Sequence, residues 1–311
     1  MSTLTRPPTA TATRGAARVP RPGARRQWAP YLFISPFFLL FTVFMLVPVG
    51  AGIYLSLTDW AGLGSPEFVG LENYSRLLRD ASFGAALANT AFYTVFAMVV
   101  VLPVALLIAL ALDAKGLRLR DFFRLTYFMP VVLSPIVIAL IFGLIFDGEY
   151  GLLNATLEAL FGFGGVSWLT DPWWARVVVV VLVLWRWTGY LTIFFLAGLQ
   201  NIPRELHEAA ELDGAGVVRR FFAVTLPQLR PVTAFIAVTM LVNTAQIFEE
   251  PFLLTQGGPG EATLSVSMFV YRAGFQRQEL GYAAAAGVVM FVIVFVLGRL
   301  GTRAFGVGRN R

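Results

Sequence analysis

Cysteine is absent from the 311 residues, and histidine occurs only once, as His207. Without cysteine the chain has no disulfide framework, no thiolate nucleophile and no cysteine-ligated metal site. A single histidine makes zinc binding or Ser-His-Asp catalysis a poor explanation of the chain. The sequence also lacks a Gly-x-x-x-x-Gly-Lys-Ser/Thr motif, so we do not expect it to bind or hydrolyse ATP. We therefore predict no catalytic residue, no cofactor and no metal site, and we predict that the chain is not an enzyme.

Charge is scarce as well. Charged residues make up 14% of the chain, hydrophobic residues make up 57%, and the mean hydropathy is +0.72. These values exclude an ordinary soluble globular protein and indicate a polytopic membrane protein. The net charge of +6 does not indicate a nucleic-acid partner, because the basic residues cluster at the ends of apolar runs instead of on one soluble face.

Six apolar runs are each long enough for the roughly 20 residues that cross a bilayer. We therefore predict an all-α fold with six transmembrane helices. Several runs contain proline, which bundled membrane helices tolerate. The runs lie at about residues 31–57, 86–112, 122–146, 174–199, 230–254 and 280–302, and the prolines are Pro36, Pro48, Pro103, Pro130 and Pro135.

Residues 1–30 are rich in Arg, Pro, Thr and Ala and have no apolar period, which predicts a disordered tail. A twin-arginine signal at Arg25-Arg26 is the alternative, but the apolar run that follows is too long and lacks a small-residue cleavage site. Most of the 24 lysines and arginines fall in this tail and in alternate loops. The positive-inside rule then places both termini, including a short tail at 304–311, in the cytoplasm.

One charged, amphipathic stretch separates the fourth and fifth runs and extends from Glu208 to Pro227. If it is helical from Pro203, its small and apolar residues share one narrow face. Gly214 and Gly216 then supply a break before a second short helix that Pro227 closes. The face could dock into a groove on a partner, and an ordinary surface helix is the alternative. The residues of the face are Ile202, Leu206, Ala209 and Ala210.

The spacing in this stretch resembles the signature loop of the permease subunits of binding-protein-dependent ABC importers. Glu-Ala-Ala is followed after three residues by Gly214, and after nine more by Val224, which precedes Leu226-Pro227 with one residue between. The longer match from Gly198 to Pro227 is similar to the maltose-type sugar permeases, although that family more often has Ile in place of Val224. The resemblance implies a coupling helix that fits a cleft on a cytoplasmic ATPase. The residues implied to make this contact are Glu208, Ala209, Ala210, Asp213, Gly214, Leu226 and Pro227.

Further matches to the same branch extend the resemblance over nearly all of residues 31–303. It divides the chain into a first helix with an outer loop at 31–84 and an ABC transporter type-1 transmembrane domain at 85–303, which holds the coupling loop at 200–228. The matching segments are Leu57–Tyr74, Asn89-Thr90, Leu254–Pro259 and Leu280–Ala286.

The resemblance also implies partners and a location. These are a second, homologous permease in a heterodimer, two ATP-binding-cassette ATPase subunits that bind the ATP, and an extracytoplasmic solute-binding protein, all at a bacterial inner membrane. The transported solute would be a sugar, with a polyol or glycerol phosphate as alternatives. A stand-alone secondary transporter or channel is the alternative function, but such carriers usually show more intramembrane carboxylates and internal repeats. A membrane enzyme is a third alternative.

Polar residues inside the runs are few, and an ionisable one there should face a cavity or a partner. Arg186 is the deepest. It either meets the substrate, with Trp187 and Tyr190 as stacking surfaces, or pairs with Glu249 or Glu250 to join two spans. In the fifth run Asn243, Gln246 and Glu250 fall on one stripe beside Thr244, which suits a polar solute, and hydrogen bonding between helices is the alternative. The resemblance implies sugar contacts at Trp187, Met240, Thr244 and Ile247, where Met240 and Ile247 are apolar departures from the family pattern.

Overall fold

The computed structural model describes residues 28–114 and 119–304. This part of the chain consists of helices and one antiparallel pair of two-residue strands, β1 (Thr58–Asp59) and β2 (Glu67–Phe68), so the predicted all-α fold is confirmed. Most of the two predicted tails, 1–30 and 304–311, lies outside the described residues, and their disorder stays a prediction. The chain divides into two compact units, Met1–Val49 and Gly50–Arg311.

The first candidate membrane span begins in the first unit. α1 (Ala29–Phe41), the π-helical η1 (Thr42–Leu46) and α2 (Val47–Leu55) follow one another without a break and give a span at Pro30–Leu55. No residue of η1 or α2 is buried. A long helix whose apolar side chains stay exposed suits contact with lipid hydrocarbon.

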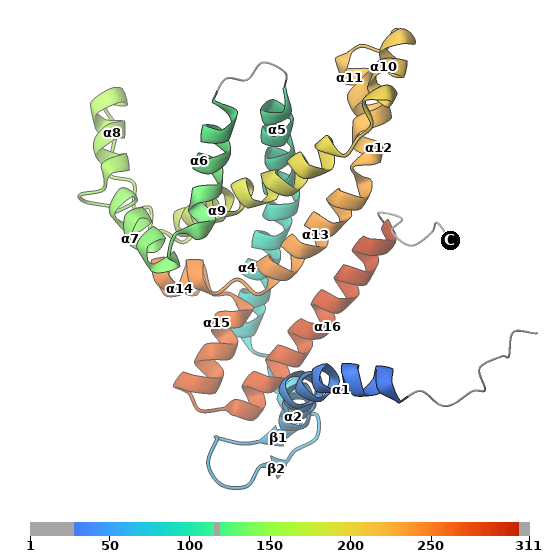
Figure 1. The fold of residues 1–311 in the computed structure, drawn as a ribbon. Coiled ribbons are helices and arrows are strands. Elements are labelled where there is room, and N and C mark those ends of the chain that lie inside the picture. Colours follow the sequence, from blue (N-terminus) through green and yellow to red (C-terminus); the bar gives the residue numbers. More distant parts are fainter. Residues whose placement is uncertain (1–27, 115–118, 305–311) are drawn as a thin grey trace, which may run out of the picture. The chain divides into compact units, whose positions relative to one another are not determined.

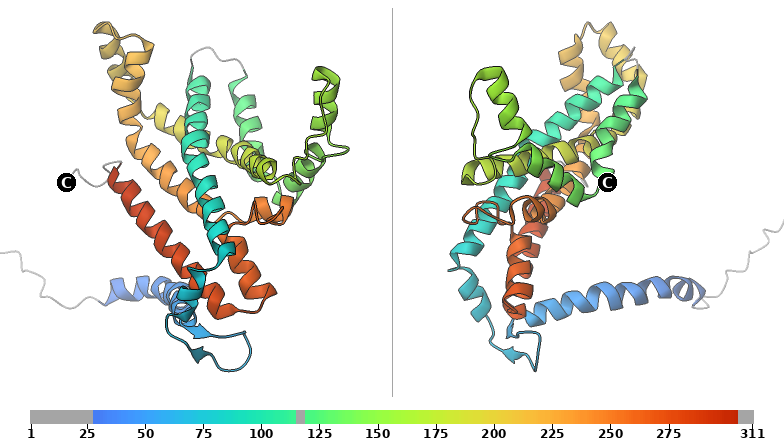
Figure 2. Two further views of the ribbon diagram at one scale, coloured as in Figure 1. Left: turned by 180° about the vertical axis from the view of Figure 1, so that it is seen from behind. Right: turned by 90° about the vertical axis from the view of Figure 1, so that its left-hand side faces the viewer.

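The second unit holds the other long helices (Figure 1). Within the described residues, five helices are long and apolar enough to cross a membrane, and one bent pair would make a sixth. In the second unit these are the continuous run α4 (Ala81–Phe96), η2 (Ala97–Val101) and α5 (Leu102–Asp113), then α9 (Pro172–Gln200), α13 (Arg230–Ala245) with α14 (Glu249–Thr255), and α16 (Leu280–Ala304). The teal ribbon in Figure 2 shows the run from α4 to α5 as one long helix. The predicted membrane architecture is confirmed.

The run predicted at 122–146 is not one straight helix. It forms α6 (Arg120–Val132) and α7 (Pro135–Ile145), which are bent by 99° from each other. Leu133 and Ser134 between them have extended ψ values of 145° and 131°. The residue before a proline is driven away from the helical region, and Pro135 is preorganised to begin a new helix. The third predicted run is therefore a bent pair of helices, and counting this pair as one span gives the predicted six within the described residues.

Three of the π-helical segments share one sequence feature. η1, η2 and η3 (Phe221–Thr225) each end two residues before a proline, namely Pro48, Pro103 and Pro227. Proline has no N–H for the carbonyl four residues earlier, and its ring crowds that carbonyl. A wider π turn just before the proline relieves this conflict without ending the helix. Pro48 and Pro103 are accommodated inside their apolar runs in this way.

The main core lies where α5, α9 and α13 pack together. Ala105 and Ala109 of α5 are fully buried and let α9 approach closely, and the hydroxyl of Thr192 on α9 donates to the carbonyl of Ala105 at 3.3 Å. Gly189 lets α6 approach α9 more closely still, because a Cβ at that position would lie 1.6 Å from the carbonyl oxygen of Tyr127. Small residues at such contacts are typical of membrane helix packing.

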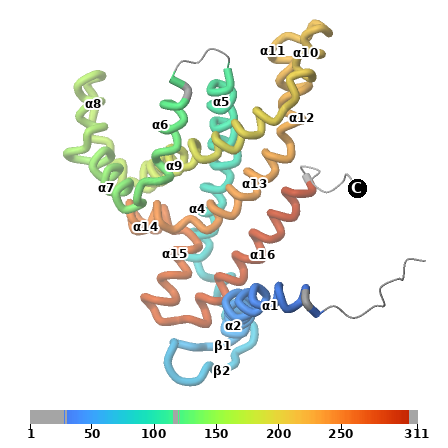
Figure 3. The backbone as a smooth tube through the Cα atoms, viewed as in Figure 1, coloured from blue at the N-terminus to red at the C-terminus, as the bar shows by residue number. Residues whose placement is uncertain are grey.

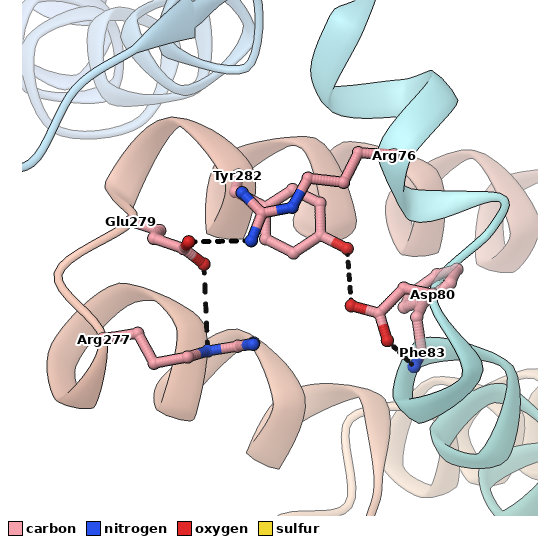
Figure 4. A network of polar contacts seen from close by, with 6 residues as sticks. All are labelled: Arg76, Asp80, Phe83, Arg277, Glu279 and Tyr282. Carbon is pink, nitrogen blue, oxygen red and sulfur yellow. Dashed lines mark hydrogen bonds and ion pairs between the residues drawn. The ribbon is translucent and has the colours of Figure 1, made fainter.

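A polar network fixes the start of α16 against α3 (Glu72–Leu77) and the start of α4 (Figure 4). Arg76 pairs with Glu279 at 2.7 Å, and the Tyr282 hydroxyl donates to Asp80 at 2.7 Å. Asp80 also caps α4 through the backbone N–H groups of Ser82 and Phe83. Burial raises the pKa of the Asp80 carboxyl, but these hydrogen bonds outweigh it and hold that pKa below its usual value.

Shorter helices complete the second unit. α15 (Val266–Tyr271) and η4 (Arg272–Gln276) pack beside α16, and α8 (Leu152–Phe161) follows α7. The segment between α9 and α13 holds α10 (Arg204–Leu212), α11 (Val217–Arg220), η3 and α12 (Leu226–Gln228). The tube in Figure 3 follows α9 into α10 and α11 and returns through α12 into α13.

Candidate functional site

A cavity of about 360 Å³ lies between α9 and the break that separates α13 from α14. The break occupies Gln246–Phe248, where the backbone leaves the helical conformation before α14 begins at Glu249. Backbone that leaves the helix at membrane depth is tolerated where it lines a cavity. The lining residues are Val183, Arg186, Trp187, Asn243, Thr244, Gln246, Ile247, Phe248, Glu249 and Glu250.

Arg186 is the charged centre of this cavity. Its Nη1 donates to Glu249 Oε2 at 3.1 Å and to Glu250 Oε1 at 2.9 Å. The Glu250 side chain is only 7% exposed, whereas that of Glu249 is 53% exposed. Arg186 therefore joins α9 to α14, as the ion-pair alternative predicted. Its guanidinium is shared between a buried carboxylate and an exposed one.

Aromatic side chains extend from the arginine along α9. The guanidinium carbon of Arg186 lies 5.7 Å from the centre of the Trp187 ring. Trp187 and Tyr190 meet edge to face, with their ring centres 5.8 Å apart. Trp187 lines the cavity, whereas Tyr190 does not and packs its ring against that of Trp187. The predicted stacking surface is thus one ring that a second ring orients.

The polar residues of α13 contribute unequally to the cavity. The Thr244 hydroxyl is buried and donates to the Met240 carbonyl of its own helix at 2.8 Å, while the Asn243 amide donates to Thr239 at 2.8 Å. Among the residues that the structure describes, the side-chain amide of Gln246 makes no hydrogen bond. Asn243 and Gln246 are both exposed and hold open hydrogen-bonding positions toward the cavity.

Most of the residues that were predicted for the substrate pathway lie together. Every predicted pathway residue except Tyr190 lines the one cavity. Of the apolar positions that the resemblance implied, Ile247 lines it, whereas Met240 is fully buried in the main core. Val183 and Phe248 were missed. A signal existed for Val183, because it lies three and four residues before Arg186 and Trp187 and therefore on their face of α9.

The segment between α9 and α13 holds the predicted first short helix and the predicted break. The second helix was predicted to end at Pro227, which was wrong: α11, η3 and α12 follow one another without a break, and Pro227 lies in the first turn of α12. α10 ends at Leu212, and Gly214 then adopts a φ of +74°, so the predicted break is present. No atom lies within 4 Å of a Cβ at Gly214, and the glycine is needed here for its backbone conformation. Arg220 of α11 pairs with Glu211 of α10 at 2.9 Å and closes the hairpin.

This hairpin exposes most of the residues predicted to make the partner contact. Glu208, Ala209, Asp213 and Gly214 are exposed, and the remaining three are half-buried. Exposed aliphatic side chains surround them, which marks an interaction surface more often than an inert one. These side chains are Leu206, Leu212, Val217 and Val218.

Acidic and histidine side chains form no metal centre within the described part of the chain. No group of three or more His, Cys, Asp or Glu residues there could hold a metal ion. The two carboxylates that line the cavity, those of Glu249 and Glu250, are both ion-paired with Arg186. The site offers ion-paired charge, amide groups and an aromatic face, which suit reversible binding of a polar solute.

Comparison with known proteins assigns the class of membrane protein. Residues 102–305 match the family described as binding-protein-dependent transport system inner membrane component. This match covers more than half of the chain. The chain therefore belongs to that family of transporter permeases, as the resemblance of its loop predicted.

Curated relatives support the same family over nearly the whole chain. The arabinooligosaccharides transport system permease protein AraP of Bacillus subtilis (strain 168) is 38% identical over 283 residues, which cover 90% of each chain. The lactose transport system permease protein LacF of Rhizobium radiobacter is 38% identical over 271 residues, which cover 86% of this chain and 90% of LacF.

A solved structure shows the same fold. It is the bacterial alginate ABC transporter in complex with an alginate pentasaccharide-bound periplasmic protein, with a TM-score of 0.79. The match covers 89% of this chain and 94% of that chain at 23% sequence identity. At this identity the likeness concerns the fold alone.

Proposed function

We propose that this chain is one of two permease subunits that form the sugar pathway of an ABC importer. Two cytoplasmic ATPase subunits would bind and hydrolyse the ATP, and an extracytoplasmic solute-binding protein would deliver the sugar. Permease relatives named for arabinooligosaccharides and lactose support a saccharide as the solute. One observation carries the proposal. The same two helices that line the polar cavity also border the exposed hairpin.

The cavity suits a saccharide chemically. A sugar presents hydroxyl groups, which donate and accept hydrogen bonds, and an apolar face of C–H groups. Asn243, Gln246 and Glu249 are exposed to the cavity and supply acceptors and amide donors. Trp187 offers a flat surface for the apolar face. Glu250 and Thr244 are buried and hold this arrangement in place.

The hairpin is suited to transmit movement to the cavity. α9 ends at Gln200 and α13 begins at Arg230, so each helix runs from the hairpin to one wall of the cavity. The two helices are tightly packed near the hairpin, because a Cβ at Gly198 of α9 would lie 3.1 Å from the side chain of Val232 of α13. We infer that an ATPase docked on the hairpin would move both walls together and switch access to the cavity.

The proposed mechanism requires the hairpin to face the cytoplasm. The distribution of lysine and arginine supports this orientation and places both termini on the same side. Domain boundaries at 31–84 and 85–303, with a coupling loop at 200–228, follow from the same proposal.

Purification of the complete assembly tests the proposal. An affinity tag after Arg311 should recover this chain together with a second permease and ATPase subunits. In proteoliposomes with the solute-binding protein, the assembly should take up radiolabelled arabinooligosaccharide or lactose only when ATP is present on the ATPase side. Uptake that needs no ATP, by a chain that purifies alone, would instead support the secondary transporter or channel.

Trp187→Ala is the variant that links uptake to the cavity. It should reduce uptake at least about tenfold, because it removes the aromatic face, while assembly stays normal. Trp173→Ala is the matched control, since Trp173 is exposed at the start of α9 and does not line the cavity. Equal uptake by both variants would show that the cavity is not part of the transport pathway.

A further inference from the structure

The charges in the cavity do not balance. Its lining holds one positive group, Arg186, and two negative groups, Glu249 and Glu250. No other Lys, Arg, His, Asp or Glu is among the described residues that line it. The lining therefore holds one more acidic than basic side chain.

The two carboxylates have different positions relative to the solute. Glu250 is 7% exposed and lies 2.9 Å from Arg186, so it neutralises the arginine inside the protein. Glu249 is 53% exposed and lies 3.1 Å from the same nitrogen of Arg186. Glu249 thus shares a cation that Glu250 already neutralises, and its negative charge is the one that a solute in the cavity would meet.

This arrangement alters the role expected of the arginine. A lone Arg186 would attract an anionic sugar, such as a uronate or a sugar phosphate, through paired hydrogen bonds. Here the guanidinium already donates to two carboxylates. An anionic sugar would have to displace a carboxylate or accept its repulsion, and clefts of low dielectric strengthen such repulsion. A neutral sugar meets no such repulsion, and its hydroxyls can donate to Glu249.

We propose that Glu249 is a specificity-determining residue, which makes the cavity select neutral saccharides against anionic ones of the same size. This inference rests on the proposed sugar pathway and narrows its substrate class. Two like charges a few ångström apart near a protein surface change a binding constant by about tenfold or more. We therefore expect at least this degree of discrimination.

Binding to the purified permease and ATPase assembly tests the proposal. The solute-binding protein is left out so that its own selectivity does not contribute. The probes are maltose, lactose and cellobiose, each compared with the aldonate made from it, which has a similar size and one added carboxylate. Equilibrium dialysis should show neutral probes binding at least about tenfold more tightly than their aldonates. Glu249→Gln should reduce this ratio by about tenfold, mainly through tighter binding of the aldonates.

Three variants separate the charge from other effects. Glu249→Asp keeps the carboxylate and should keep the discrimination. Glu158→Gln removes an exposed negative charge from α8, outside the cavity, and should also keep it. In the Glu249→Gln variant Arg186 keeps its ion pair with Glu250, so the assembly of permease and ATPase subunits should stay intact.

The possible failures can be told apart. If neutral probes bind and the aldonates bind equally well, or if Glu249→Gln leaves the ratio unchanged, the inference is wrong while the proposed sugar pathway stands. If no probe binds in the wild type, the proposed site fails and the inference fails with it.

Discussion

At the scale of single residues, Arg186 shows how a buried ion pair fixes a membrane site. An arginine in the middle of a span requires a partner, and the sequence offered the substrate or the glutamates at 249 and 250. The structure pairs it with both. Sequence reasoning could not assign the two carboxylates separate roles, because their burial depends on how α14 turns after the break at Gln246–Phe248.

Arg186→Met should destabilise the assembly in detergent. The substitution leaves Glu250 buried without a cation, and breaking a buried pair in this way typically costs about 3–5 kcal/mol. Arg186→Met combined with Glu250→Gln should recover most of the loss, because no buried charge remains. Thermal unfolding of the purified assembly measures both effects.

Glu249→Gln is the comparison for this prediction. It should change stability by less than about 1 kcal/mol, because Glu249 is largely exposed and Arg186 keeps Glu250. An unchanged unfolding temperature in Arg186→Met would show that the pair does not hold α9 to α14.

At the scale of helices, the sequence predicted the number and placement of the apolar runs better than their shape. Prolines occur inside continuous helices at Pro48 and Pro103 but divide α6 from α7 at Pro135. Local sequence does not distinguish these cases. At the first two a π turn absorbs the proline, whereas the residues before Pro135 are extended and let α7 turn by 99°. The contacts that α7 makes with α14, far along the chain, accompany this turn.

Close packing of α6 on α9 gives a prediction at this scale. Gly189→Ala should destabilise the protein by about 1–3 kcal/mol or more, because the added Cβ would meet the Tyr127 backbone and the two helices would have to separate. Gly143→Ala in α7 is the matched control. It has no atom within 4 Å of the new Cβ and should be neutral or stabilising by up to about 1 kcal/mol. Unfolding temperatures that fall equally in both variants would contradict the packing described for α6 and α9.

At the scale of the whole molecule, the membrane orientation can be tested without background labelling, because the chain has no cysteine. Gly216→Cys in the hairpin should react with a membrane-impermeant maleimide only in inside-out vesicles. Gly64→Cys, in the segment between β1 and β2, should react only in intact cells. Labelling of Gly216→Cys from outside would place the hairpin beyond the reach of a cytoplasmic ATPase.

The sequence predicted the first half of the hairpin closely and its second half less well. The glycines located the end of α10 and the turn at Gly214, whereas Pro227 begins α12 instead of closing a short helix. The resemblance of the loop to the permease family was recognisable because glycine and proline restrict the backbone in fixed ways, whatever residues surround them. Contacts within the chain do not define a docking role for the hairpin. An experiment that includes the ATPase partner tests that role.

The most direct test of the central claim compares two glycine variants in ATP-driven uptake. Gly214 and Gly64 have similar positive φ values, +74° and +76°, and neither has an atom within 4 Å of an added Cβ. Gly214→Asp and Gly64→Asp therefore impose similar local strain, but only the first alters the proposed docking surface. With both variants at normal levels in the membrane, Gly214→Asp should lose at least about tenfold in uptake and retain ATPase subunits poorly, as a coupling of about 1–3 kcal/mol implies. Gly64→Asp should transport normally. Normal uptake with fully bound ATPase in Gly214→Asp would contradict the account.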